Sequence, residues 1–129
     1  MADYTAKAIG DMEGFYRGLF LKARSELGVR SFGLAIVELE PHSDAHPDHD
    51  HADAGQEEVF VVLRGTGEME VDGETIPLDP ETVVRVGPSA KRRIRPGPDG
   101  MRLVAIGGVP GQPYEPPAYT EVGAPDPKA

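Results

Sequence analysis

The four histidines of this chain all fall within one short stretch, at positions 42, 46, 49 and 51. Only one residue separates His49 from His51, so in an extended chain both imidazoles point to the same side. Two imidazoles placed in this way, together with a carboxylate from the next strand, form a site for a divalent transition metal. Glu58 begins the following apolar stretch and is the candidate carboxylate, and His46 is a candidate fourth ligand.

The same stretch is also rich in aspartate, so a solvated loop that binds no metal is the alternative interpretation. A calcium-binding EF-hand does not fit. Asp48 and Asp50 begin such a pattern, but Ala52 stands where a third oxygen ligand is needed and no flanking helices are predicted.

Composition narrows the classes of function. The 129 residues include 22 acidic and 13 basic side chains, for a formal net charge of −9, and such a field repels the phosphates of nucleic acids. There is no cysteine, which excludes disulfides and thiol chemistry. The beginning of the chain has no secretory signal, and no stretch approaches the roughly 20 apolar residues that span a bilayer. We therefore expect a cytoplasmic protein that binds neither nucleic acid nor membrane.

Alternating apolar residues predict a series of short strands from position 32 onward. They cover residues 32–40, 57–63, 68–71, 74–78, 82–86, 92–95 and 101–106. Asp72-Gly73 is a two-residue turn sequence, and the 16 glycines and 13 prolines separate the other strands. Many short strands with almost no helix are typical of an all-β sandwich or barrel.

The two ends of the chain differ from this pattern. Residues 4–9 are compatible with a short strand, and partial helical spacing predicts at most one short N-terminal helix over 22–27, capped by Gly28. We therefore divide the chain into an N-terminal segment that packs on the barrel (1–31), the barrel itself (32–108) and a proline-rich extended tail (109–129).

Residues 56–67, together with the preceding His49-Asp50-His51, resemble the first signature of the cupin superfamily. That signature has two histidines around one residue, a short gap, a glutamate, six residues and a glycine. The resemblance implies a jelly-roll cupin β-barrel and gives metal-ligand roles to His49, His51 and Glu58. The gap before Glu58 is longer than cupins usually have, and an inserted turn through Gly55 would absorb the excess. Residues 27–33 and 107–110 also resemble a subgroup of small bacterial single-domain cupins.

The second cupin signature is kept in spacing only. Its histidine, the fourth metal ligand in the family, corresponds to Arg92, which has no lone pair to donate. Alternation places Arg92 and Ile94 on one face, and the resemblance implies that this face points inward; an alternative register would make Arg93 the equivalent residue. An inward Arg92 has two candidate roles: a structural pair with Glu58, or a substrate-binding anchor for the carboxylate or phosphate of a small anionic molecule.

Three functions follow from the resemblance. The first is an enzyme that uses a divalent transition metal (Fe, Mn, Ni or Zn) to act on a small anionic metabolite. The second is a metal-free cupin that binds or senses a small molecule, and the third is a non-catalytic dimeric barrel. We expect a homodimer, because cupins commonly pair through a sheet face and residues 57–63 are apolar on both faces.

Overall fold

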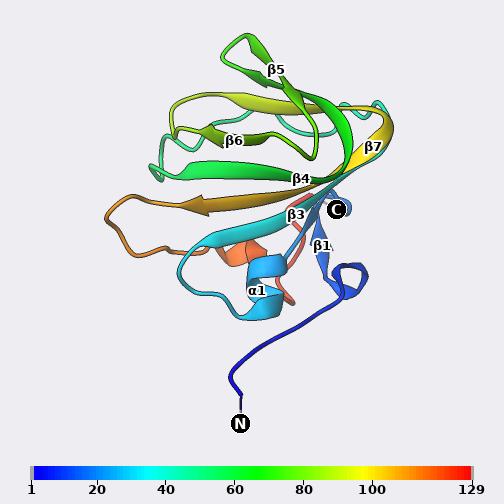
Figure 1. The fold of residues 1–129 in the computed structure, drawn as a ribbon. Coiled ribbons are helices and arrows are strands. Elements are labelled where there is room, and N and C mark those ends of the chain that lie inside the picture. Colours follow the sequence, from blue (N-terminus) through cyan, green and yellow to red (C-terminus); the bar gives the residue numbers. More distant parts are fainter. Residues whose placement is uncertain (1, 129) are drawn as a thin grey trace.

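The computed structural model describes residues 2–128 and contains one antiparallel sheet of seven strands. The sheet order is β1-β2-β3-β7-β4-β5, with β6 paired to β4 (Figure 1). The strands are β1 (Gly14–Phe15), β2 (Phe20–Leu21), β3 (Gly33–Leu39), β4 (Glu57–Val71), β5 (Glu74–Leu78), β6 (Val83–Val86) and β7 (Arg92–Gly108). Across the described residues, α1 (Ala23–Leu27) is the only α-helix, beside the 3-10 turns η1 (Ile9–Asp11) and η2 (Ala118–Thr120). The predicted all-β class with one short helix is confirmed. None of these helices is long and apolar enough to cross a membrane.

Two long strands, β4 and β7, pair along most of their lengths and bend together (Figure 1). The prediction of separate strands over 57–63 and 68–71, and over 92–95 and 101–106, is wrong. Register shifts between Val62 and Arg64 and between Gly65 and Gly67 keep each strand continuous while it changes direction. Gly65 has a φ of 85°, and a Cβ there would lie 2.1 Å from the carbonyl oxygen of Gly100. The glycines therefore allow a sharp bend and a close approach, not an end to the strand.

The core lies against one face of this bent sheet. It contains Leu19 of the β1–β2 turn and buried apolar side chains from all the longer strands: Val37, Leu39, Phe60, Val62, Met69, Leu78, Val84, Val86, Ile94, Met101, Leu103 and Ala105. Arg92 and Ile94 are both fully buried, which confirms that alternation turns these two β7 residues inward. Arg95, one position on, is partly exposed and pairs with Glu70 of β4 at 2.8 Å.

The N-terminal segment differs from the prediction in two places. Residues 4–9 do not form a strand, and residues 14–21, where no strand was predicted, form the β1–β2 hairpin. The hairpin turn holds Tyr16 and Arg17 at φ values of 52° and 56°, a conformation that residues other than glycine rarely adopt. The predicted helix over 22–27 is confirmed as α1, and Gly28 ends it at a φ of 77°.

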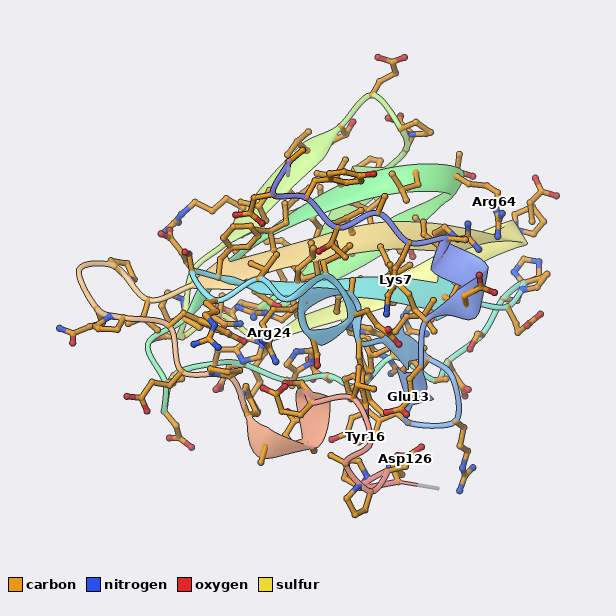
Figure 2. All side chains as sticks on the ribbon, turned by 90° about the horizontal axis from the view of Figure 1, so that it is seen from below. Lys7, Glu13, Tyr16, Arg24, Arg64 and Asp126 are labelled. Carbon is orange, nitrogen blue, oxygen red and sulfur yellow. The ribbon has the colours of Figure 1, made fainter. Side chains whose placement is uncertain are left out.

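The C-terminal tail is bound to the N-terminal segment. Lys22 donates to the carbonyl of Glu121 at 2.8 Å, and Arg24 pairs with the carboxylate of the same residue at 2.6 Å. The carboxylate of Asp126 accepts from the backbone N–H of Tyr16 at 3.0 Å, and Figure 2 shows these two residues side by side. Residues about a hundred positions apart therefore close the same end of the molecule.

Candidate metal centre

The histidine segment lies beside the start of β7. His49 and Arg92 exchange backbone hydrogen bonds of 3.1 and 2.8 Å, and the N–H of His51 donates to the carbonyl of Pro88 at 2.9 Å. These bonds hold the segment extended, which is the conformation that places His49 and His51 on one side.

A turn over residues 52–55 then leads into β4. The N–H of Gly55 donates to the carbonyl of His51 at 2.9 Å, and Gly55 has a φ of 70°. This is the predicted inserted turn, and it absorbs the long gap between His51 and Glu58. Glu58 is the second residue of β4 and lies between Val86 of β6 and Gly107 of β7, so its backbone is fixed on both sides.

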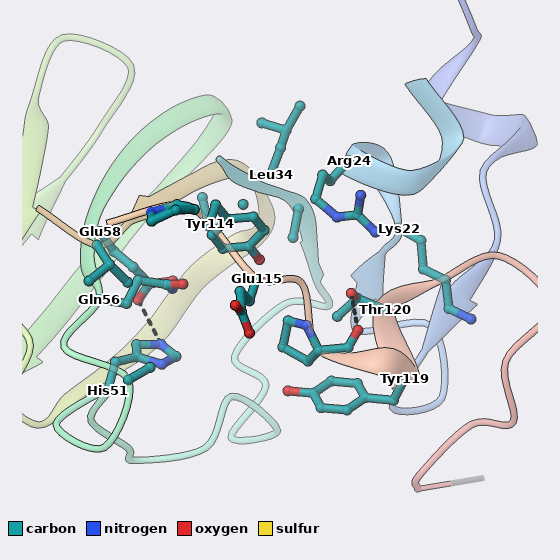
Figure 3. A pocket seen from close by; sticks show the side chains of 18 of the residues that line it. Lys22, Arg24, Leu34, His51, Gln56, Glu58, Tyr114, Glu115, Tyr119 and Thr120 are labelled. Carbon is teal, nitrogen blue, oxygen red and sulfur yellow. Dashed lines mark hydrogen bonds and ion pairs between the residues drawn. The ribbon is translucent and has the colours of Figure 1, made fainter. Parts of the chain in front are cut away.

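His49, His51 and Glu58 converge, each offering one ligand atom within 4.8 Å of the others. His51 Nε2 lies 3.2 Å from Glu58 Oε1 (Figure 3), so these two ligand atoms face each other directly. His49 Nδ1 is 2.8 Å from the carbonyl of Pro47; because a carbonyl only accepts, Nδ1 carries the hydrogen and Nε2 carries the lone pair. Metal-ligating histidines typically donate the hydrogen of their other ring nitrogen to a backbone carbonyl in this way. The donor set of two imidazole nitrogens and one carboxylate oxygen therefore fits a divalent metal.

Arg92 is enclosed behind Glu58. Its side chain is fully buried, with Nη1 donating to Glu58 Oε1 at 2.8 Å, Nη2 donating to the carbonyl of Gly87 at 2.6 Å, and Nε left without a partner. It is not among the residues that line the cavities next to the site. Of the two predicted roles for Arg92, this geometry corresponds to the structural pair with Glu58.

His46 lies near this group but not within it. Its side chain is 1% exposed, and Nδ1 accepts a hydrogen bond of 3.1 Å from the backbone N–H of Ile94. The lone pair of the neutral ring is thereby used, and Nε2 carries the hydrogen. The ring centre is 5.4 Å from that of His49. His42 is exposed and also lies outside the group.

Burial and neighbouring charges set the ionisation of the site. Burial alone would raise the pKa of Glu58, but the contact with His51 and the charges of His51 and Arg92 lower this pKa below its usual value. Burial lowers the pKa of His49, and burial lowers that of His46 to about 3. At neutral pH Glu58 is therefore an ionised carboxylate, and His49 and His46 are neutral imidazoles. Ionised carboxylates and neutral imidazoles are the forms that bind metals.

Two cavities meet at this site. One, of about 480 Å³, is lined by Arg24 and by Tyr114 of the tail (Figure 3). The other, of about 910 Å³, is lined by His46 and His49. His51, Glu58 and Tyr119 line both. The tail tyrosines could not be predicted from the sequence, because no motif marks them and their place depends on how the tail docks.

Comparison with known proteins identifies the family to which the chain belongs. A family model described as the cupin domain matches residues 35–107, more than half of the chain. The chain belongs to the cupin family. This confirms the resemblance found in the two histidines, Glu58 and Gly65.

Solved cupin structures share the fold. A cupin protein from Bacteroides fragilis matches with a TM-score of 0.70 at 22% identity, over 93% of this chain and 95% of that one. A protein described as a sugar phosphate isomerase of the cupin superfamily, from Silicibacter pomeroyi, matches with a TM-score of 0.65 at 17% identity, over 80% of this chain and 74% of that one. The cupin domain of an XRE family transcriptional regulator from Enterobacter cloacae matches with a TM-score of 0.55 at 24% identity, over 64% of this chain and 86% of that one. Comparison with curated proteins gives no match.

Proposed function

We propose that this cupin is a metal-dependent protein in which His49, His51 and Glu58 hold one divalent transition metal and a small acidic molecule binds beside it. The observation that carries the proposal is the convergence of His49, His51 and Glu58, whose ligand atoms all lie within 4.8 Å of one another. Imidazole nitrogens and a carboxylate oxygen that converge in this way are a donor set for one divalent transition metal, which supports the proposal.

Arg92 supports this function as a positioning residue. It holds Glu58 by one oxygen and is itself held by the carbonyl of Gly87. An arginine at this place adds no ligand, so a metal bound by two histidines and one carboxylate keeps open positions. When bound, such a metal supplies Lewis-acid or redox chemistry to a molecule that occupies those positions. Iron, manganese, nickel and zinc are all compatible with this set of ligands.

Metal analysis of protein purified without a histidine tag tests the proposal. We expect close to one equivalent of a transition metal in the wild type, and at least a tenfold loss of affinity in His51→Ala and Glu58→Gln. His42→Asn is the matched control, since His42 is exposed, lies outside the group and has a φ of 53° that asparagine tolerates. Equal metal contents in His51→Ala and His42→Asn would contradict the proposal.

The ion pair between Arg92 and Glu58 favours one competing function, a non-catalytic barrel that needs no metal. In that case the 2.8 Å contact would serve only to neutralise a buried carboxylate. Wild-type protein that takes up no metal after incubation with each of the four ions would support this alternative.

We also propose that the chain forms a homodimer through the outer face of β4 and β6. Leu63 and Val83 are 45% and 64% exposed on these strands, and a pair of such faces would bury them. Light scattering tests this: a species of twice the 13.8 kDa chain mass is expected, and a monomer at every concentration would contradict it.

A further inference from the structure

The larger cavity has a wall made of aromatic rings. Phe15, Tyr16, Phe20 and Tyr119 all line it, and they contact one another. The rings of Phe15 and Phe20 stack with centres 5.2 Å apart, and those of Tyr16 and Tyr119 lie within 14° of parallel at 6.4 Å. This aromatic wall combines the β1–β2 hairpin with η2 of the tail, so two distant segments of the chain build one surface.

The aromatic wall is incompletely buried. Tyr119 is 41% exposed, and Tyr16 and Phe20 are only partly buried, although Phe15 behind them is 6% exposed. Large rings at an interior site usually bury their faces. Tyr119 also lines the smaller cavity, and Figure 3 shows its hydroxyl end directed to the side of that cavity where His51 lies. The aromatic wall and the three candidate metal ligands line the same larger cavity.

The backbone at Tyr16 is strained. Its φ of 52° is followed by 56° at Arg17, and the carboxylate of Asp126 holds the turn by accepting from the N–H of Tyr16. Glycine or asparagine would adopt this conformation more easily. A strained residue that presents its ring to a cavity is typical of a binding site.

His46 supplies a polar group between the aromatic wall and the metal centre. Its ring centre lies 6.0 Å from Phe20 and 5.4 Å from His49. Because the N–H of Ile94 occupies Nδ1, the hydrogen of the neutral ring is fixed on Nε2. His46 lines the larger cavity, so this N–H is a fixed donor for an acceptor oxygen placed there.

We infer that the larger cavity binds a small aromatic acid, with its planar ring on the aromatic wall and its acidic oxygen at the His46 N–H and the metal. The inference rests on the proposed function, because the oxygen needs the metal as its second partner. An aliphatic acid of equal charge lacks the flat face that stacks on Tyr16 and Tyr119. The volume of about 910 Å³ lies in the range of small-molecule sites.

Calorimetric titration of the metal-loaded protein with benzoate and with cyclohexanecarboxylate tests this. The two acids carry the same charge and differ mainly in the flatness of the ring. We expect benzoate to bind about three- to tenfold more tightly, as stacking contacts are worth that factor. Equal affinities, or no binding of either acid to metal-loaded protein, would overturn the inference and leave the metal site standing. Failure to load metal would overturn both.

Variants separate the parts of the site. Tyr119→Leu and Tyr16→Asn should remove the preference for benzoate without changing the metal content. Tyr4→Leu is the control, because Tyr4 is 79% exposed and does not line the cavity; this variant should keep the preference for benzoate. His46→Asn keeps an acceptor for the Ile94 N–H but loses the Nε2 donor. This variant should therefore weaken the binding of both acids by about the same factor. A preference that survives both tyrosine variants would refute the aromatic wall as the binding surface, and unchanged affinities in His46→Asn would refute the donor.

Discussion

Glu58 Oε1 is the atom on which the site depends. It lies 3.2 Å from His51 Nε2 and accepts from Arg92 Nη1 at 2.8 Å. The carboxylate is 12% exposed, so water can screen it only weakly. One buried oxygen therefore links the candidate metal ligands to the buried Arg92.

Replacing Arg92 should leave the buried charge of Glu58 without a partner. We expect Arg92→Met to lower the free energy of unfolding by about 3 kcal/mol, because Glu58 would lose its partner. Chemical denaturation measures this. The control is Arg95→Met, whose pair with Glu70 is about two-fifths exposed on both sides and should cost under about 1 kcal/mol. Equal losses in the two variants would mean that the Arg92 pair is no more important than a surface contact.

His46 should make stability depend on pH. Burial lowers its pKa to about 3 in the folded protein, whereas the unfolded chain takes up a proton near pH 6.5. Stability is therefore lost as the pH falls from about 6.5 toward 3. Between pH 7 and 5 we expect metal-free wild type to lose about 2 kcal/mol more than His46→Asn. Parallel pH profiles from urea denaturation would show that His46 does not stay neutral.

At the scale of elements, the bend shared by β4 and β7 depends on Gly65. Gly65→Ala must both adopt a φ of 85° and place a Cβ 2.1 Å from a backbone oxygen, so we expect a loss of about 3 kcal/mol or more. Gly73→Ala is the matched control: its φ is 84° but nothing lies within 4 Å, so only the conformational cost of about 1 kcal/mol applies. Equal losses of stability on thermal unfolding of the two variants would show that the close approach of Gly65 to Gly100 is not what requires glycine at this bend.

The sequence predicted the parts of the site that depend on local alternation. The same-side placement of His49 and His51 follows from spacing along an extended chain, whereas the inserted turn before Glu58 and the inward Arg92 were implied by the resemblance to cupins. The tautomer of His46 could not be predicted, because a backbone N–H on β7 fixes it. The continuity of β4 and β7 was also missed, since glycine and proline end most strands but here form bulges.

At the scale of the whole molecule, the N-terminal segment and the tail together complete the cavities. Their docking depends on tertiary contacts that no motif records: Lys22 is 2% exposed and bonds to Glu13 and to the carbonyl of Glu121. Strands β1 and β2 have two residues each, too few for a periodic signal. The aromatic wall was therefore invisible in the sequence.

Lys22→Met should release the tail while it leaves the barrel folded. The variant keeps the length of the side chain but loses its hydrogen bonds, so hydrogen exchange should quicken over residues 110–128 and stay unchanged in β4 and β7. Lys7→Met is the control, as its pair with Glu26 involves a lysine that is 43% exposed. Equal exchange in the tail of both variants would show that Lys22 does not hold it.

The most direct test of the central claim is anomalous diffraction from crystals grown with a transition metal and measured at its absorption edge. We predict one peak about 2.0 to 2.3 Å from a nitrogen of His49, a nitrogen of His51 and an oxygen of Glu58. Arg92 should remain beside Glu58, and His46 should remain bonded to the Ile94 N–H. A metal-soaked crystal with no peak among these three residues, and with the Arg92–Glu58 pair intact, would contradict the account.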